Sequence, residues 1–156
     1  MDHVALQILR AGLEQDSRVV QNAAQRAQQH LHEGHPGSLE ACGFELQRLY
    51  NVLEKSFERV CEAFENHFEK RADYHEKMIE RMTLALPGIR PPFLPGADWD
   101  AVRELKSFRH VFRHAYELQL RSESLARLAA IGARIADAFP VWTASFVAEV
   151  DRELRR

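Results

Sequence analysis

The sequence predicts an all-α protein, folded as an antiparallel bundle of about five helices. Apolar residues recur every three or four positions over most of the chain, the period of one helix face, and no segment shows the sustained alternation of a strand. Glycine and proline gather in two stretches, residues 33–38 and 86–98, which predict the main breaks between helices. With 156 residues, of which 46% are hydrophobic, the chain is expected to form a single domain over residues 1–156 with its own core.

Two long helices are expected before the middle of the chain. The first covers residues 2–33 and places its small and apolar positions on one side, among them Val4, Ile8, Ala11, Val19, Ala23 and Ala27. The second is expected to begin at Ser38, whose hydroxyl can cap it, and to run to about residue 70. Its apolar face includes Leu39, Cys42, Leu46, Leu49, Leu53, Phe57, Val60 and Phe64.

Three further helical segments are expected in the second half. A short helix is expected near residues 72–86, and Asp98 is expected to cap a helix over residues 98–118. The last apolar period runs over residues 125–154, where Pro140 should kink the helix or split it in two. The proline-rich stretch 86–98 is interpreted as a structural connector, with a role at the rim of a cleft as the alternative.

Composition restricts the function and the location. A formal net charge of −2 argues against general coating of nucleic acid, so any such contact must come from a local patch. No apolar run approaches the roughly 20 residues that span a bilayer, and the first residues do not read as a signal peptide. The two cysteines, Cys42 and Cys61, are expected to be reduced and part-buried, which favours a cytoplasmic protein without membrane contact.

A local basic patch lies in the segment "FRHVFRHAYE", residues 108–117. On a helical wheel with Arg109 at zero, Arg113 lies at about 40°, Lys106 at about 60°, His110 at about 100° and His114 at about 140°. With Arg103 they form a stripe beside an apolar face that contains Leu105, Phe108, Phe112 and Ala115. The sequence neighbours supply few acids to neutralise this stripe, and phosphate suits arginine well, so the stripe predicts an anionic ligand.

The order of Arg109, His110, three residues, His114, one residue and Tyr116 resembles the signature of HEPN-domain toxins of the HepT type. The flanking stretch "MTLALPGIRPPFL" is also similar to the HepT-like family, and the similarity covers about residues 38–154. The resemblance implies a HEPN-like helical fold and a toxin of a toxin–antitoxin system that cleaves RNA. It also implies a homodimer in which the Arg–His motifs of two subunits meet in a cleft at the interface.

For this chain the resemblance implies that Arg109 and His114 are catalytic and that Tyr116 is the tyrosine to which a cognate, MntA-like nucleotidyltransferase antitoxin attaches AMP. Such a modification would add negative charge and bulk beside the arginines. His110, Arg113 and Lys106 are expected to contact the RNA. A histidine near neutral pKa can take the proton of a ribose 2′-hydroxyl and another can protonate the leaving oxygen, so no metal or other cofactor is expected.

Several alternatives remain open at this point. The stripe can be a solvated basic face, Tyr116 a packed tyrosine at the rim of the bundle, and the protein a non-catalytic HEPN subunit that binds nucleotide or partners a nucleotidyltransferase. A metal bound by His110 and His114 is disfavoured because neighbouring arginines repel a cation and no zinc-protease spacing follows. The histidines of "HLHEGHP" are interpreted as a polar helix end, and His75 as a surface histidine that has a place in the cleft as its alternative.

Overall fold

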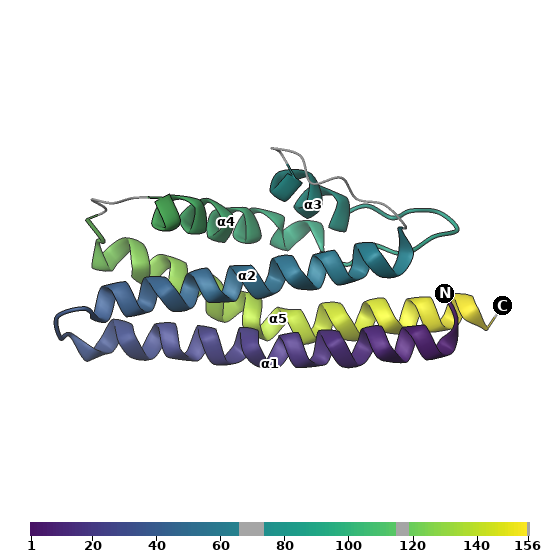
Figure 1. The fold of residues 1–156 in the computed structure, drawn as a ribbon, viewed down its shortest axis with the longest axis horizontal. Coiled ribbons are helices and arrows are strands. Elements are labelled where there is room, and N and C mark those ends of the chain that lie inside the picture. Colours follow the sequence, from purple (N-terminus) through teal and green to yellow (C-terminus); the bar gives the residue numbers. More distant parts are fainter. Residues whose placement is uncertain (66–73, 115–118, 156) are drawn as a thin grey trace.

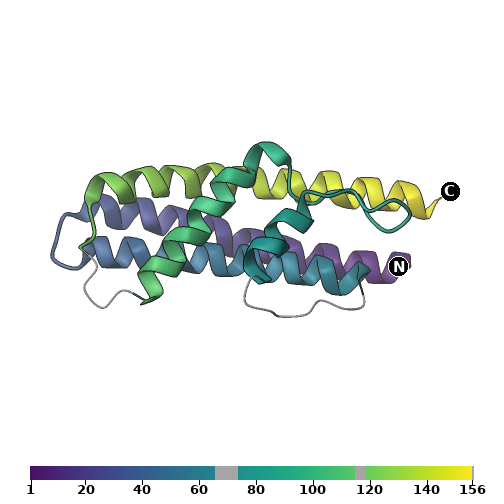
Figure 2. The ribbon, with the colours of Figure 1, turned by 90° about the horizontal axis from the view of Figure 1, so that it is seen from above.

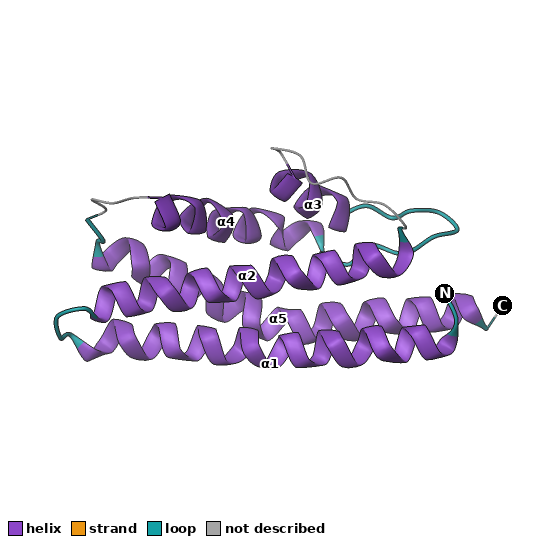
Figure 3. Cartoon of the chain, viewed as in Figure 1, coloured by secondary structure: helices purple, strands orange, loops and turns teal. Residues whose placement is uncertain are grey.

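A computed structural model describes residues 1–65, 74–114 and 119–155 of the chain, and in these residues every named element is helical (Figure 3). The elements are α1 (His3–Glu33), α2 (Ser38–Phe64), α3 (Tyr74–Met82), a 3-10 helix η1 (Gly96–Asp98), α4 (Trp99–His114) and α5 (Ser122–Leu154). Helix α1 runs antiparallel to both α2 and α5, and α4 runs back toward the beginning of α5, as Figures 1 and 2 show. The prediction of an all-α antiparallel bundle of about five helices is therefore confirmed for the described residues.

The bundle has a long layer and a short one. Helix α1 packs along both α2 and α5, which contact each other much less, while α3 and α4 lie on the side of α2 that faces away from α1 (Figure 1). Seen from above, α4 crosses α2 and α5 obliquely (Figure 2). This close approach is permitted by Gly43 of α2, where a Cβ atom would come within 2.7 Å of the Phe112 ring of α4. Helix α4 thus covers the core with one face and leaves the other on the surface.

The first helix has the expected extent but a different inward face. Asp2 is its N-cap and accepts a hydrogen bond from the Ala5 amide nitrogen at 2.8 Å. Its buried positions are Leu6, Leu9, Leu13, Val20, Ala23, Ala24 and Ala27. Val4 and Ile8, which were expected on the apolar side, are each 69% exposed, so that part of the prediction is wrong. The leucines form the buried face of α1 because α2 and α5 pack over their side of the helix.

The second and third helices are shorter than expected. Helix α2 ends at Phe64, where Glu65 adopts an extended backbone with φ −130°, instead of continuing to about residue 70. Ser38 does not cap α2, because the cap position is Gly37 in the left-handed region at φ 86°. Helix α3 ends at Met82, and the side chain of Arg90 donates hydrogen bonds to the carbonyl oxygens of Arg81 in its last turn and of Leu84 beyond it.

Helix α5 continues through Pro140 as one element, so the expected split is wrong. Proline removes one helical hydrogen bond, but the surrounding turns are held by buried side chains on both sides, including Phe139 and Trp142. The Trp142 indole nitrogen donates to the Asp98 carboxylate at 3.0 Å, so Asp98 links η1 to α5 and the expected capping role is not observed. None of the described helices is both long and apolar enough to cross a bilayer.

Candidate functional site

The exposed side of α4 carries a hollow of about 700 Å³ that contains the predicted stripe except for Arg103. Its walls are formed by Lys106, Ser107, Arg109, His110, Val111, Arg113 and His114 from α4, together with His75 and Glu76 from α3. The helix brings these α4 side chains to one side because three or four residues make one turn. Five residues singled out from the sequence therefore share one hollow, and Tyr116 lies outside the described residues.

Arg109 is held in place from α2 rather than left in solvent. Its Nε donates to the Asn51 side-chain oxygen at 2.6 Å, and one Nη lies 3.8 Å from a carboxylate oxygen of Glu54. Its guanidinium also lies over the Tyr50 ring, 5.5 Å from the centroid. The side chain is only 14% exposed. Because arginine has five N–H donors, these contacts fix its orientation and still leave donors for an anion in the hollow.

His110 and His114 lie one above the other on the open side of α4. Both are exposed, and their ring centroids are 4.7 Å apart. The Nδ1 of His114 lies 2.9 Å from the carbonyl oxygen of His110. A carbonyl oxygen only accepts, so this nitrogen carries the proton and donates, which leaves Nε2 of His114 as the atom available to a substrate.

The stripe is less free of acids than the sequence suggested. Glu76 of α3 pairs with Arg103 at 2.6 Å and with Lys106, so one carboxylate neutralises part of the charge of two cations. The hydrogen bond from Lys106, with help from Arg103, holds the pKa of Glu76 below its usual range. The sequence suggested that few acids neutralise the stripe. This expectation is wrong because the neutralising acids come from α2 and α3, which are distant from α4 in the sequence.

The side chain of Arg113 in the stripe is exposed to solvent. It is exposed, and among the described residues no ion pair forms with it. It lies one turn beyond Arg109, on the same wall of the hollow. An anion that enters the hollow would therefore meet an oriented guanidinium, that of Arg109, and an exposed one, that of Arg113.

The structure adds groups from α2 and α3 to those of α4. His75 is 43% exposed and lines the hollow, which favours its alternative position in the cleft. Its Nδ1 lies 2.6 Å from the carboxylate of Glu54, which also faces Arg109. Burial, together with the neighbouring Glu54 carboxylate, raises the pKa of Tyr50 well above its usual range, so this phenol stays neutral beneath Arg109. In the sequence, Glu54 shows only as a polar residue four positions after Tyr50.

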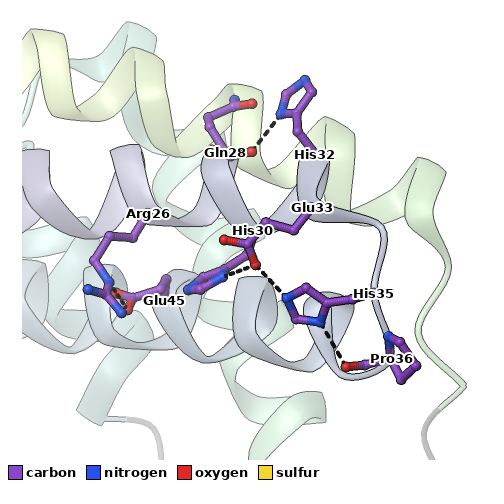
Figure 4. A network of polar contacts seen from close by, with 8 residues as sticks. All are labelled: Arg26, Gln28, His30, His32, Glu33, His35, Pro36 and Glu45. Atoms are coloured by element: carbon purple, nitrogen blue, oxygen red, sulfur yellow. Dashed lines mark hydrogen bonds and ion pairs between the residues drawn. The ribbon is translucent and has the colours of Figure 1, made fainter.

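The remaining histidine cluster forms a polar helix end, as predicted. Figure 4 shows one oxygen of Glu33 between two rings, 2.9 Å from His30 and 2.8 Å from His35. His32 bonds to the carbonyl oxygen of Gln28 at 2.6 Å. The hydrogen bond to the Pro36 carbonyl, together with Glu33, raises the pKa of His35. Within the described ranges, no three histidine, cysteine or acidic side chains are grouped so that they could hold a metal ion.

Both cysteines are buried and free, as expected. Burial raises the pKa of Cys42 and of Cys61 to about 11 in each case. Thiols with such values stay protonated near neutral pH and are poor nucleophiles. The cysteines are therefore not candidates for a nucleophile, and the candidate reactive groups are the arginines and histidines of the hollow.

These residues suit a reaction at a phosphodiester. A fixed guanidinium can hold a phosphate oxygen and stabilise charge that develops on it, and imidazole nitrogens can move protons to and from neighbouring oxygens. The same groups can also serve as a plain binding site for a nucleotide phosphate. The arrangement therefore suits an anionic ligand such as a phosphate.

Comparison with known proteins identifies the family. The chain matches no curated protein and no solved structure. The family of HepT-like proteins matches residues 41–150, well over half of the chain, including most of α2, all of α3 and α4, and most of α5. The match leaves out α1, in agreement with the resemblance, which was confined to about residues 38–154. The chain therefore belongs to the HepT-like family.

Proposed function

We propose that this protein is the toxin of a toxin–antitoxin pair and acts as a metal-independent endoribonuclease. The observation that carries the proposal is the position of Arg109, which is oriented by Asn51 and Glu54 at the edge of a hollow that His114 also lines. Membership of the HepT-like family supports the same function. In this proposal Arg109 and His114 are catalytic, while His110, Arg113 and Lys106 contact the RNA backbone.

The direct test is cleavage of end-labelled RNA by the purified protein in the presence of EDTA. We expect cleavage that EDTA does not reduce, because imidazole and guanidinium groups supply the proton transfers and the charge. The fragments should end in a 2′,3′-cyclic phosphate and begin with a 5′-hydroxyl. Intact RNA after incubation with freshly purified protein would contradict the proposal and leave the non-catalytic, nucleotide-binding HEPN subunit as the function to test.

We also propose a homodimer with α4 at its interface. One stripe offers few groups for holding and cutting a phosphodiester, and a two-fold axis beside it would double them. Exposed apolar side chains lie on α4 and on the part of α2 that contacts α4: Val111, which lines the hollow, is 48% exposed, and Phe44, next to Gly43, is 58% exposed. Sedimentation at tens of micromolar is expected to show a dimer, and Phe44→Asp to shift it toward monomer and lower cleavage. A wild-type monomer with full activity would overturn the composite site.

Tyr116 is proposed as the site of control by a nucleotidyltransferase antitoxin. A nucleotide on its hydroxyl would bring phosphate charge to the arginines of α4 and exclude RNA from them. After incubation with the partner enzyme, ATP and magnesium, intact-mass spectrometry should show added AMP together with loss of ribonuclease activity. Tyr116→Phe should keep much of its cleavage and escape both changes. An AMP that maps to another residue would return Tyr116 to a packing role.

A further inference from the structure

We propose that His75, oriented by Glu54, is a second proton-transfer residue of the site and acts as the general base, with His114 as the general acid. The inference rests on the proposed ribonuclease function and assigns its two proton transfers to residues of one chain. It starts from the position of His75 in the same hollow as Arg109 and His114.

The contacts of His75 fix which nitrogen faces the substrate. Its Nδ1 lies 2.6 Å from an oxygen of Glu54, and an ionised carboxylate only accepts hydrogen bonds. The ring therefore donates through Nδ1 and keeps Nε2 unprotonated when the imidazole is neutral. The side chain is 43% exposed, so Nε2 has access to a ligand in the hollow.

The partners of the two histidines assign the roles. A carboxylate on Nδ1 stabilises the imidazolium that forms when Nε2 accepts a proton, as in catalytic His–Asp pairs. His75 has such a carboxylate, whereas the Nδ1 of His114 faces only the neutral carbonyl of His110. His75 is therefore the better proton acceptor, and His114 is the better donor.

Glu54 also connects the base to the phosphate site. Its carboxylate oxygen that bonds to His75 lies 3.8 Å from the Arg109 guanidinium. A phosphate held by Arg109 would thus come close to the ring that Glu54 orients. Among the described residues, the other charged or titratable groups around the hollow are Tyr50 on α2, Tyr74 and Glu76 on α3, and Arg103, Lys106, His110, Arg113 and His114 on α4.

The step balances without a cofactor. Nε2 of His75 takes the proton of the ribose 2′-hydroxyl, and the 2′-oxygen forms a bond to phosphorus. The bond from phosphorus to the 5′-oxygen breaks, and the proton on Nε2 of His114 passes to that oxygen. The products are a 2′,3′-cyclic phosphate and a 5′-hydroxyl, and exchange of protons with water resets both rings.

The assignment can be tested with two dinucleotide substrates, one normal and one with sulfur in place of the bridging 5′-oxygen. A thiolate leaves without a proton, so His114→Ala should be impaired on the normal substrate and nearly restored on the sulfur one. His75→Ala should lose about 10²-fold or more on both, the usual cost of a lost acid–base group, and added imidazole should restore part of its rate. His32→Ala, which removes an exposed histidine outside the hollow, is the control and should match the wild type.

A readout independent of activity is the ¹⁵N spectrum of the histidines. In the wild type, Nδ1 of His75 should be protonated at a pH where the ring is neutral, and Glu54→Gln should weaken that preference. A wild-type ring protonated on Nε2 instead would overturn the proposal even if His75→Ala failed to fold.

The kinetic outcomes separate this inference from the function on which it rests. If His114→Ala is inactive on the normal substrate while His75→Ala cuts like the wild type, the base assignment is wrong and the ribonuclease function stands. If sulfur restores His75→Ala instead of His114→Ala, the two roles are reversed and the proposal fails. A wild type that cuts neither substrate would remove both the function and this inference.

Discussion

Alanine in place of His114 or Arg109 is expected to lower RNA cleavage by about 10²-fold or more. His114 is exposed, and among the described residues its ring bonds only to its own helix, so its removal deletes a proton-transfer group with little effect on packing. Arg109 is the oriented guanidinium of the hollow, and its loss removes the group that holds the phosphate. Initial rates on labelled RNA, together with thermal unfolding curves, measure both effects.

The chain offers matched controls for both variants. His32 bonds through Nδ1 to a carbonyl four residues earlier, as His114 does, but it lies at the end of α1, so His32→Ala should cut like the wild type. Arg127 pairs with Glu104 of α4 on the surface outside the hollow, so Arg127→Ala is the control for Arg109→Ala. Arg109→Lys keeps the charge but loses the forked donors, and it should recover only part of the activity. Wild-type rates in both alanine variants would show that the site is assigned wrongly.

The fold was predictable because it depends on periodicity and breaks that are local in the sequence. The beginning of α1 follows from Asp2, and the turns between helices from the glycine and proline stretches. Periodicity could not choose the inward face of α1, because Leu6, Leu9 and Leu13 recur at helical spacing just as Val4 and Ile8 do. The inward face of α1 is determined by tertiary packing, because α2 and α5 cover the leucines.

The part of the site that lies on α4 was also predictable from local sequence. The stripe of α4 is a local pattern, so its residues fall together on one wall of the hollow as expected. Asn51, Glu54 and Glu76 were missed because they meet α4 only after α2, α3 and α4 have packed. Nothing in the local sequence distinguishes such acids from ordinary solvated ones. The result is a site whose charge is balanced more closely than a helical wheel of α4 suggests.

The stretch 86–98 was expected to be a structural connector, and Arg90 gives that interpretation its physical basis. Its side chain is completely buried. Nε donates to Glu65 at 2.8 Å, one Nη donates to the Leu84 and Pro91 carbonyl oxygens at 3.2 Å each, and the other Nη donates to the Arg81 carbonyl at 3.0 Å. This one guanidinium joins the end of α2, the end of α3 and the loop.

Arg90→Ala is therefore expected to destabilise the protein by about 3 kcal/mol or more, the low end for breaking a buried ion pair. Glu65, whose side chain is 5% exposed, would keep its contact with Arg81, while three carbonyl oxygens would lose a donor. For a chain of this length, that loss corresponds to a fall in Tm of roughly 6–12 °C. Urea unfolding followed by circular dichroism measures the free energy of unfolding.

The comparison variant is Arg127→Ala, which breaks an exposed pair with Glu104 and should cost less than about 1 kcal/mol. Cleavage by Arg90→Ala, measured well below its Tm, should remain near the wild-type rate, because no residue of 86–98 lines the hollow. A stability within about 0.5 kcal/mol of the wild type would contradict the buried-pair argument, since most surface changes fall in that range. A folded Arg90→Ala protein with 10²-fold slower cleavage would instead place the loop at the rim of the cleft, because only a direct part in the site produces a loss of that size.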